Sequence, residues 1–314
     1  MLLREPELAA LAVRMGEQAL QQRLARERGA VAPTGDPVGE ELAPRHLRPS
    51  GRAIHWVLTL CGLRDRGRRN ARSIELRHHT LHLARLPTAF EDFRLLHLSD
   101  LHIDGGERYL QALVERVRGI ACDACVLTGD FRFASRGPSE PAIEAFARLL
   151  PVLPAPAYAV LGNHDGIAMW AGLEALGVRV LMNENLALQR GEARLHIAGI
   201  DDAHYFRTHD LARAVAGVPV DACALLLSHT PQPFREAQAH GFAGMLSGHT
   251  HGGQICLPGG VPLVTETRAP RRLARGSWLY DGMAGYTSVG CGCSKVDARF
   301  FCPPEVTVHT LRAA

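Results

Sequence analysis

Five short apolar runs, each ending in residues that bind metal ions or phosphate, constrain this chain more than any other feature. The runs are LLHLSDLH (95–102), CVLTGD (125–130), AYAVLGNHD (157–165), ALLLSHTP (224–231) and GMLSGHTH (244–251). Continuous apolar runs of this length are typical of strands that are buried on both faces of a sheet. The sequence therefore predicts a buried and largely parallel sheet.

Helical segments separate the first three runs. Between the first two, Leu110, Leu113, Val114 and Val117 recur at the spacing of one helical face. The stretch PAIEAFARLL (141–150) repeats this pattern before the third run. Strand–helix–strand units of these lengths form right-handed crossovers, and ligands gather beyond the carboxyl ends of the strands. We expect the polar endings of all five runs to meet in one place.

Further strands are predicted in the second half of the chain. Residues 178–202 contain two or three β-rich stretches divided by Asn-Glu-Asn and Arg-Gly-Glu turns. This pattern predicts antiparallel strands that open a second sheet. GSWLY (276–280) and EVTVHTL (305–311) also predict strands.

The N-terminal part of the chain has a different pattern. Residues 1–28 predict one amphipathic helix, and the Gly- and Pro-rich stretch 29–41 predicts a linker. The helix would carry one apolar stripe, made of Leu8, Leu11, Met15 and Leu20.

A basic stretch follows, with nine arginines from Arg45 to Arg77 around the apolar segment AIHWVLTLCGL (53–63). Two interpretations are open. Apolar residues beside clustered arginines suit peripheral contact of residues 53–72 with an anionic membrane surface. A buried helix with a solvated basic end is the favoured interpretation of the two, because about ten apolar residues also suit a core helix.

Composition sets broad limits on function. With 314 residues, 46% of them hydrophobic, the chain is long enough to bury a full core. Neither an apolar run of about 18 residues nor a signal-peptide pattern occurs, so we expect a cytoplasmic protein, at most peripheral at the inner membrane surface. The net charge of +3 is too small to indicate a nucleic-acid partner.

Eight cysteines are scattered along the chain, and reduced thiols are expected. Cys122 and Cys125 form a C-x-x-C, but no second pair follows at zinc-site spacing. Packed thiols are therefore expected there. For Cys291 and Cys293, in GCGC, a flexible loop and a metal or redox role stay open.

The polar endings of the five runs supply carboxylate, amide and imidazole donors. They comprise Asp100, His102, Asp130, Asn163, His164, Asp165, His229, His249 and His251. Without cysteine, this mixture suits two divalent ions such as Mn²⁺, Fe²⁺ or Zn²⁺ and disfavours a closed structural zinc site. Asp130 is best placed to bridge two ions. At a strand end, D-x-H directs Asp100 and His102 to the same face.

The charge of such a centre indicates its substrate. Two divalent ions bring four positive charges, while Asp100 and Asp130 supply two negative ones, so the centre attracts phosphate. Metal-activated hydroxide can then attack phosphorus in line. We expect His164, with its imidazole held by the Asp165 carboxylate, to serve the leaving oxygen as general acid. The alternative is that His164 only caps its turn.

These motifs, in this order, make the chain resemble the calcineurin-like metallophosphoesterases, whose signature reads D-x-H, G-D, G-N-H-D/E, H and G-H-x-H. The resemblance covers residues 86–312 and implies a four-layer α/β/β/α sandwich with a dinuclear metal centre. It implies one ion held by Asp100, His102, Asp130 and His251. It implies a second ion held by Asp130, Asn163, His229 and His249. Residues 1–85 are then an N-terminal helical extension and 86–314 the metallophosphoesterase domain.

GHTHGGQICLP (248–258) and FFCPPEVTVHTL (300–311) resemble the bacterial branch with membrane-associated phosphodiesterases and UDP-2,3-diacylglucosamine pyrophosphatase-like members. This implies hydrolysis of a phosphodiester or pyrophosphate in a lipid-linked or nucleotide-linked substrate, with Mn²⁺ expected to support it in vitro. A nucleotide phosphodiesterase or nuclease, and a non-catalytic metal-site scaffold, are the alternatives. The physiological substrate, the ion in vivo and the oligomeric state stay open.

Glycines surround the two histidines of the last run. A loop that feeds two neighbouring ions needs backbone angles that only glycine adopts cheaply, which predicts this role for Gly248, Gly252 and Gly253.

Overall fold

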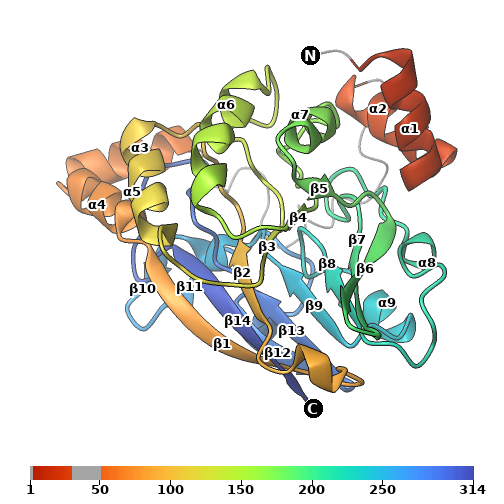
Figure 1. Cartoon of the computed structure of the whole chain (residues 1–314). Coiled ribbons are helices and arrows are strands. Elements are labelled where there is room, and N and C mark those ends of the chain that lie inside the picture. The colour runs from red at the N-terminus through yellow and green to blue at the C-terminus, as the bar shows by residue number, and fades with distance from the viewer. Residues whose placement is uncertain (1–2, 30–50) are drawn as a thin grey trace.

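The computed structural model describes residues 3–29 and 51–314, which fold around two six-stranded sheets (Figure 1). In spatial order, the first sheet contains β1 (Glu75–Leu83), β14 (Glu305–Ala313), β2 (Arg94–Leu98), β3 (Ala124–Leu127), β4 (Ala157–Ala159) and β5 (Arg179–Val180). Pairing is parallel from β2 to β5, as the apolar runs predict. Strand β14 is antiparallel to β2, and β1 is parallel to β14.

The second sheet is also mixed. In spatial order it contains β12 (Gly276–Tyr280), β13 (Met283–Thr287), β9 (Gly244–Ser247), β8 (Ala224–Leu227), β7 (Ala193–Gly199) and β6 (Glu184–Arg190). The four central strands are parallel, and both edge strands are antiparallel to their neighbours. The prediction that residues 178–202 open a second sheet with antiparallel strands is confirmed for β6 and β7. It is wrong for β5, which lies in the same segment but pairs in parallel with β4 of the first sheet. A separate hairpin pairs β10 (Cys256–Leu257) with β11 (Val261–Pro262).

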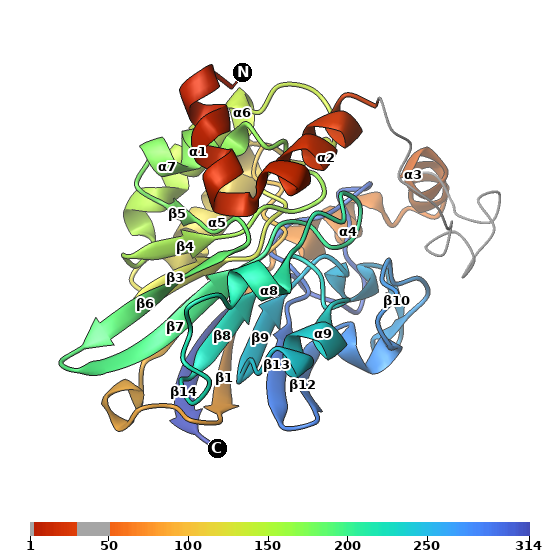
Figure 2. The ribbon, with the colours of Figure 1, turned by 90° about the vertical axis from the view of Figure 1, so that its right-hand side faces the viewer.

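Helices cover the outer faces of both sheets. On the first sheet lie α5 (Glu107–Val117), α6 (Glu140–Leu149) and α7 (Met169–Ala175), and on the second lie α8 (Leu211–Ala214) and α9 (Phe234–Ala239). Figure 2 shows α8 and α9 in front of the second sheet. Short 3-10 turns occur at η2 (Thr88–Phe90), η3 (Leu150–Val152), η4 (His251–Gly253) and η5 (Arg271–Leu273).

Three apolar cores separate these layers. Adjacent strand residues point to opposite faces, so Leu95 packs between the two sheets while Leu96 packs under the helices. A third core lies between the second sheet and its two helices, around Phe234 and Trp278. The expected four-layer α/β/β/α arrangement is confirmed.

The N-terminal helix is two helices, α1 (Glu5–Met15) and α2 (Glu17–Glu27). The expectation of one helix is wrong because Gly16 adopts φ +92° and turns the chain. Leu11, Met15 and Leu20 nevertheless share the first core, whereas Leu8 is half-buried. The predicted linker lies, apart from its first residue, outside the described residues.

The basic stretch forms α3 (Gly51–Leu60) and α4 (Arg64–Arg72). The interpretation as a buried core helix is wrong for α3, because Trp56 is 65% exposed and Leu60 is 83% exposed. Among the side chains of α3 that the structure describes, only that of Leu58 is buried. Within residues 3–29 and 51–314, no helix has both the length and the apolar character needed to cross a bilayer.

Strand β1 was not expected from the sequence, because ELRHHTLHL carries too few apolar residues to stand out. It lies within residues 1–85 and pairs with β14 along its whole length. The first sheet thus receives a strand from that range, and the division of the chain at residue 85 stays a prediction.

Candidate metal centre

The five polar endings follow β2, β3, β4, β8 and β9, and they lie where the carboxyl ends of these strands of both sheets meet. Potential ligand atoms come within 4.8 Å of one another in three groups, which are Asp100–His102–His251, His102–Asp130–His164 and Asp130–His229–His249. Because Asp130 belongs to two of these groups, its carboxylate lies between two clusters of imidazoles.

In the first cluster, His251 Nε2 lies 3.2 Å from His102 Nε2 and 3.3 Å from Asp100 Oδ1. The His102 Nε2 also lies 3.8 Å from Asp130 Oδ2. Two imidazole nitrogens that converge with carboxylate oxygens in this way can be held together by a cation between them. The geometry of these four side chains therefore suits one metal ion.

The second cluster shares Asp130 with the first. His229 Nε2 lies 3.4 Å from Asp130 Oδ1 and 3.0 Å from Asn163 Oδ1. His249 Nδ1 lies 3.2 Å from the same His229 nitrogen. The other nitrogen of His249, Nε2, is buried and has no hydrogen-bond partner among the described residues. Here, too, lone pairs converge as for a metal ion.

In two of the imidazoles, a hydrogen bond from one ring nitrogen to a backbone carbonyl determines which nitrogen faces the centre. His102 Nδ1–H donates to the Arg132 carbonyl oxygen at 2.8 Å. His229 Nδ1–H donates to the Thr128 carbonyl oxygen at 2.8 Å. Because Nδ1 is used by the carbonyl, Nε2 of each ring is the nitrogen that faces the centre, as metal-binding histidines require.

Burial keeps most of these imidazoles neutral. It lowers the pKa of His102 to about 4 and those of His249 and His251 well below their usual value. For His229, burial acts in the same direction but the Asp130 carboxylate outweighs it, raising the pKa to about 10. Neutral imidazole is the form that binds metal ions.

The two carboxyl groups differ. Burial raises the pKa of Asp100 to about 6. Burial also opposes ionisation of Asp130, but the neighbouring His229 and His164 hold its pKa well below the usual range. Asp130 is therefore a carboxylate, as a bridging ligand must be. Two carboxyl groups, an amide and imidazoles, without thiols, fit two divalent ions.

Five residues of the centre have left-handed backbones: φ is +50° at Asp100, +41° at His102, +55° at Asp130, +70° at His249 and +49° at His251. Such angles cost roughly 1–3 kcal/mol each in residues other than glycine and cluster at functional sites. The strand-end geometry predicted for the D-x-H pair, Asp100 and His102, is therefore wrong. Strand β2 ends before this pair, and two sharp turns direct both side chains to the centre.

The glycines of the last run have two different roles. Gly252 and Gly253 adopt φ +57° and +88°, so they supply the angles expected of them. Gly248 does not adopt a positive φ. A Cβ atom there would lie 1.8 Å from Ser99 Oγ and 2.4 Å from Asp100 Oδ2, so Gly248 allows a close approach of two segments.

The position of Asp165 differs from the expected one. Its carboxylate accepts backbone N–H groups from Asp130 at 2.8 Å, Phe131 at 2.9 Å, Arg132 at 3.3 Å and Gly162 at 2.8 Å. All its acceptor capacity is thereby used on the backbone. Asp165 ties its loop to the segment after β3 and does not hold the imidazole of its neighbour.

His164 is oriented by a carbonyl instead. Its Nδ1–H donates to the Phe133 carbonyl oxygen at 2.7 Å, and its backbone N–H donates to Asp130 Oδ1 at 2.9 Å. Its Nε2 lies 3.9 Å from Asp130 Oδ2. The free nitrogen of this partly exposed ring thus points to the centre.

Comparison with known proteins identifies the family. Residues 93–253 match the family described as "Calcineurin-like phosphoesterase". The chain belongs to this family. It is accordingly a metal-dependent phosphoesterase, a hydrolase of phosphoester bonds, and the family uses divalent metal ions.

Bacterial relatives are similar over most of their length. The uncharacterized metallophosphoesterase YkoQ of Bacillus subtilis is 29% identical over 233 residues, 71% of this chain and 85% of that protein. The phosphodiesterase YaeI of Escherichia coli is 28% identical over 236 residues, 70% of this chain and 82% of that protein.

A vertebrate relative is similar over a smaller part of its length. A transmembrane protein with metallophosphoesterase domain from Danio rerio is 30% identical over 189 residues, 54% of this chain and 43% of that protein.

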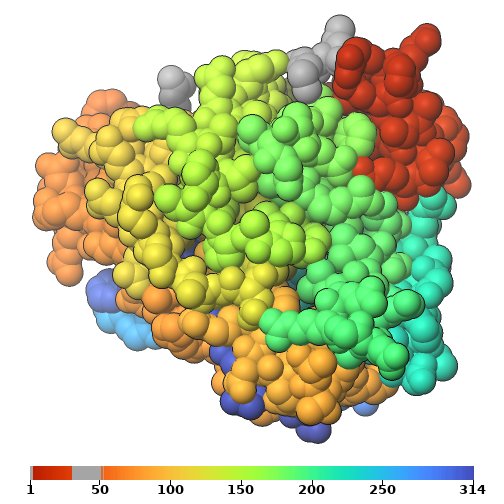
Figure 3. Space-filling model, in the orientation of Figure 1, coloured from red at the N-terminus to blue at the C-terminus, as the bar shows by residue number. Residues whose placement is uncertain are grey.

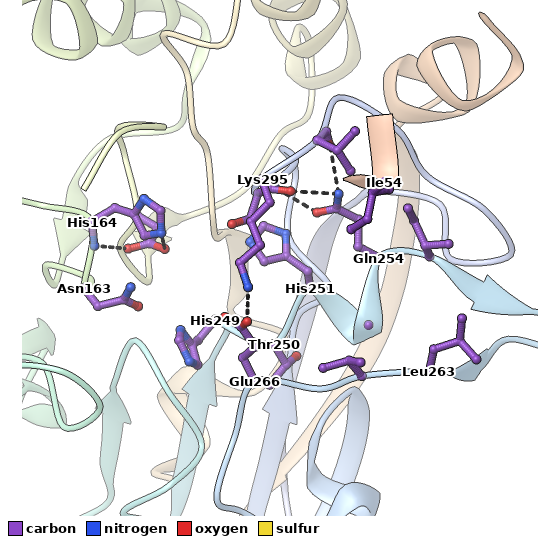
Figure 4. Close-up of a pocket in the computed structure, with 16 residues that line it drawn as sticks. Ile54, Asn163, His164, His249, Thr250, His251, Gln254, Leu263, Glu266 and Lys295 are labelled. Atoms are coloured by element: carbon purple, nitrogen blue, oxygen red, sulfur yellow. Dashed lines mark hydrogen bonds and ion pairs between the residues drawn. The ribbon is translucent and has the colours of Figure 1, made fainter. Parts of the chain in front are cut away.

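A cavity of about 220 Å³ opens on the metal centre of this phosphoesterase. One end is lined by Asp130 and His164, and the other by apolar side chains of α3 and of the segments around β10 and β11. Figure 4 shows Asn163 and His164 on one side of the cavity and Ile54 and Leu263 on the other.

Two residues at the centre have no signal in the motifs. His204 packs its ring against His249, with centroids 4.2 Å apart, and Arg299 is fully buried with Nη2 3.3 Å from His251 Nδ1. Both come from loops. The turn that carries His204 is capped by the Asp202 carboxylate, and the Asp-Asp pair of GIDDAHYF, directly after β7, is the one sequence feature that could have drawn attention to it.

The cysteines resemble packed thiols more than ligands. Cys125 is fully buried in the first core, as expected. The loop of Cys291 supports the centre from behind, because its backbone N–H donates to the Ser99 carbonyl oxygen at 2.8 Å and its thiol to the Glu305 carbonyl oxygen at 3.1 Å. In the part of the chain that the structure describes, no metal-ligand group includes a cysteine.

Proposed function

We propose that this phosphoesterase cleaves a phosphodiester or pyrophosphate bond in a substrate with an apolar group, and that a lipid-linked phosphate is the preferred class. The supporting observation is the cavity, which runs from Asp130 and His164 to an apolar wall. That wall consists of Ile54, Ile255, Leu263, Val264 and Val296. A phosphate bound at the polar end would place its substituent against these side chains.

We propose two ion positions. Asp100, His102, Asp130 and His251 would hold one ion, and Asp130, Asn163, His229 and His249 the other. Two divalent ions, with Mn²⁺ expected to be effective in vitro, would bind phosphate oxygens and activate water. Asp130 has the position required of a ligand shared by both ions, since its two oxygens face His102 and His229 respectively.

His164 is the residue we propose for proton transfer. Its Nδ1–H donates to the Phe133 carbonyl, which leaves Nε2 as the nitrogen that faces the centre. A proton on Nε2 can pass to the leaving oxygen of the substrate. Asp165 contributes indirectly, because its contacts with backbone N–H groups fix the loop that carries Asn163 and His164.

We also propose peripheral contact with an anionic membrane surface through residues 53–72. On α3, Trp56 is 65% exposed, Val57 58% and Leu60 83%, and the next helix presents exposed arginines such as Arg66. Apolar and basic groups in this arrangement bind anionic bilayers. Ile54 of the same helix lines the cavity, so a lipid-linked phosphate at the inner membrane surface would lie beside the centre.

The substrate class is tested with matched variants of exposed leucines. Leu263 lines the cavity and is 55% exposed, whereas Leu279 on β12 is 70% exposed and is not among the lining residues. For a lipid-linked pyrophosphate, we expect Leu263→Ser to lower kcat/KM about tenfold, because partial loss of leucine burial removes about 1.4 kcal/mol. Leu279→Ser should have no effect.

The same assay includes a phosphomonoester, bis(p-nitrophenyl) phosphate and a nucleotide-linked pyrophosphate, with Mn²⁺ added after chelation. Equal kcat/KM values on short-chain and lipid-linked substrates, or equal effects of the two leucine variants, would refute the apolar substrate class. Preference for nucleotide-linked pyrophosphate would instead support the nucleotide phosphodiesterase alternative.

Membrane contact is tested by flotation with vesicles that contain one-third anionic phospholipid. We expect the wild type to float and Trp56→Ser to float less. Val220→Ser, at a site 96% exposed and outside residues 53–72, is the control and should float like the wild type. Absence of wild-type binding at low salt would rule out the contact.

A further inference from the structure

The N-terminal hairpin α1–α2 places a buried arginine against the loop that carries Asn163, His164 and Asp165. Arg23 on α2 has no solvent exposure. Its Nη2 donates to the Asp165 carbonyl oxygen at 2.6 Å, and its Nη1 pairs with Asp201 Oδ1 at 3.1 Å. The guanidinium also stacks on Phe206, with Cζ 3.3 Å from the ring centroid.

A second side chain of α2 contacts the same loop two residues further on. Glu27 Oε1 accepts the Ile167 backbone N–H at 2.7 Å and the Arg23 Nε–H at 3.0 Å. The two residues are four positions apart, so they lie on one helical face. Arg23 and Glu27 thus satisfy one carbonyl and one N–H of the loop at residues 165 and 167.

The loop between these contacts is tied to the metal centre on its other side. The Asp165 carboxylate accepts the backbone N–H groups of Asp130 and Gly162, both at 2.8 Å. The Asp165 residue is therefore hydrogen-bonded to Arg23 through its carbonyl and to the Asp130 backbone through its carboxylate. Through this one residue, α2 is linked to the carboxylate that lies between the two clusters of imidazoles.

We propose that Arg23 and Glu27 are positioning residues, which hold the 162–167 loop and so align Asn163 and His164 with Asp130. The inference rests on the site roles given in the proposed function and extends them to the N-terminal hairpin. Arg23 and Glu27 each form a hydrogen bond with the backbone of this loop, at Asp165 and Ile167 respectively. Side chains that orient metal ligands typically affect metal affinity or activity 10- to 100-fold when removed.

Docking of the hairpin alone does not require these contacts, because Arg14 on α1 anchors it elsewhere. Arg14 Nη1 pairs with Glu174 at 2.8 Å, and its Nη2 pairs with Glu184 at 2.5 Å. Figure 1 and Figure 2 both place the hairpin beside α7, which carries Glu174, and Figure 3 shows it packed over one corner of the molecule. Arg14 therefore provides a matched control.

The test compares Arg23→Gln, Glu27→Ala and Arg14→Gln in the full chain by hydrogen exchange of peptides that cover residues 162–168. We expect exchange at least tenfold faster in Arg23→Gln, about threefold faster in Glu27→Ala and unchanged within twofold in Arg14→Gln. All three should lower Tm, because each removes a contact of the hairpin.

Kinetics and metal binding provide independent measurements. We expect Arg23→Gln to lower kcat about 10- to 100-fold with KM within about twofold, and to weaken Mn²⁺ binding measured by calorimetry. Arg23→Lys keeps a charge for Asp201 but cannot also reach the Asp165 carbonyl, so it should recover Tm without recovering loop protection. Arg14→Gln should match the wild type in kcat.

Equal exchange of residues 162–168 in Arg23→Gln and Arg14→Gln would overturn the inference, even in an active enzyme. If Arg23→Gln does not fold, the exchange rate of Glu27→Ala is the deciding measurement. The Glu27 side chain is 24% exposed, and in its absence the buried Arg23 charge is still paired with Asp201. A wild type that hydrolyses no phosphoester would refute the proposed function but leave the exchange comparison intact.

Discussion

Two groups of histidines lie inside the fold, and they differ in what their nitrogens face; in the second group His79 is only half-buried. At the candidate metal centre, the nitrogens of His102, His229, His249 and His251 converge with carboxylate oxygens. Between the sheets, the nitrogens of a second group contact one another. In that group His309 Nε2 lies 3.2 Å from His97 Nδ1, and His309 Nδ1 lies 3.1 Å from His79 Nδ1.

Burial does not distinguish the two groups. It lowers the pKa of His97 to about 3 and that of His309 well below its usual value, as it does for three histidines of the centre. Two other features distinguish the two groups. The inter-sheet histidines lie within strands and have ordinary backbone angles, and the nearby Glu305 carboxylate is occupied by the Tyr286 hydroxyl at 2.9 Å. Left-handed turns and available carboxylates therefore mark the centre, and buried imidazole alone does not.

Removing the Asp130 carboxylate, which both clusters of the centre share, should give the largest difference in activity between a variant of the centre and a variant of the inter-sheet group. Asp130→Asn keeps the shape but removes the charge that both clusters face, so we expect hydrolysis of bis(p-nitrophenyl) phosphate to fall at least about 10³-fold, since metal-ion stabilisation supplies several kcal/mol. His97→Gln, in the inter-sheet group, should stay within about twofold of the wild type. Initial rates at saturating Mn²⁺ measure both.

Undiminished Mn²⁺-dependent turnover in Asp130→Asn would contradict the assigned site. A comparable loss in His97→Gln would contradict the division into two groups, because it would place the inter-sheet histidines in the reaction.

Metal addition should stabilise the protein only through the centre. At 100 times Kd, a ligand that binds the folded state adds about 2.7 kcal/mol, which corresponds to roughly 4 °C in Tm for a chain of this size. We expect this rise on adding Mn²⁺ to the chelator-treated wild type and to His309→Gln. His251→Gln should lose at least half of it in a thermal melt. Equal shifts in the two variants would show that the ions bind elsewhere.

The sequence could predict the residues of the centre because each motif is local. Asp100 with His102, and His249 with His251, are pairs separated by one residue at the end of an apolar run, and parallel strands bring such ends together. The inter-sheet group could not be predicted in this way. His79 and His309 become neighbours only because β1 pairs with β14 in register, across 230 positions of sequence.

The error over Asp165 has the same physical origin. Adjacency in sequence suggested a contact with His164, but the carboxylate found backbone N–H groups of residues 130–132, which belong to another strand end. The contact of Arg23 with the Asp165 carbonyl was equally invisible, because it joins elements 142 residues apart. Local motifs therefore predict which residues supply the donor atoms, whereas the contacts that hold these residues in place join distant parts of the sequence.

Acid should destabilise the protein through the inter-sheet group. Burial lowers the pKa of His97 from 6.5 to about 3, so below pH 6.5 the unfolded chain takes up a proton that the folded chain does not. The free energy of unfolding then falls as pH falls, by about 1 kcal/mol between pH 6.5 and 5.5 for this histidine. His97→Gln cannot titrate, and urea unfolding of the metal-loaded variant should show a shallower loss by that amount. Parallel curves for the two proteins would exclude this contribution.

The smallest effect on activity and metal binding is expected at the residue that touches both groups. Thr128 accepts His229 Nδ1–H at its carbonyl oxygen, 2.8 Å away, while its Oγ1 lies 2.9 Å from His97 Nε2. Thr128→Val removes only the hydroxyl, so a buried hydrogen bond is lost at a cost of about 1–3 kcal/mol, and the carbonyl contact with the centre persists. We expect a lower urea midpoint with kcat and Mn²⁺ affinity within about twofold of the wild type. A tenfold loss of Mn²⁺ affinity would instead mean that the hydroxyl link transmits the position of the inter-sheet histidines to His229, and that the two groups are one network.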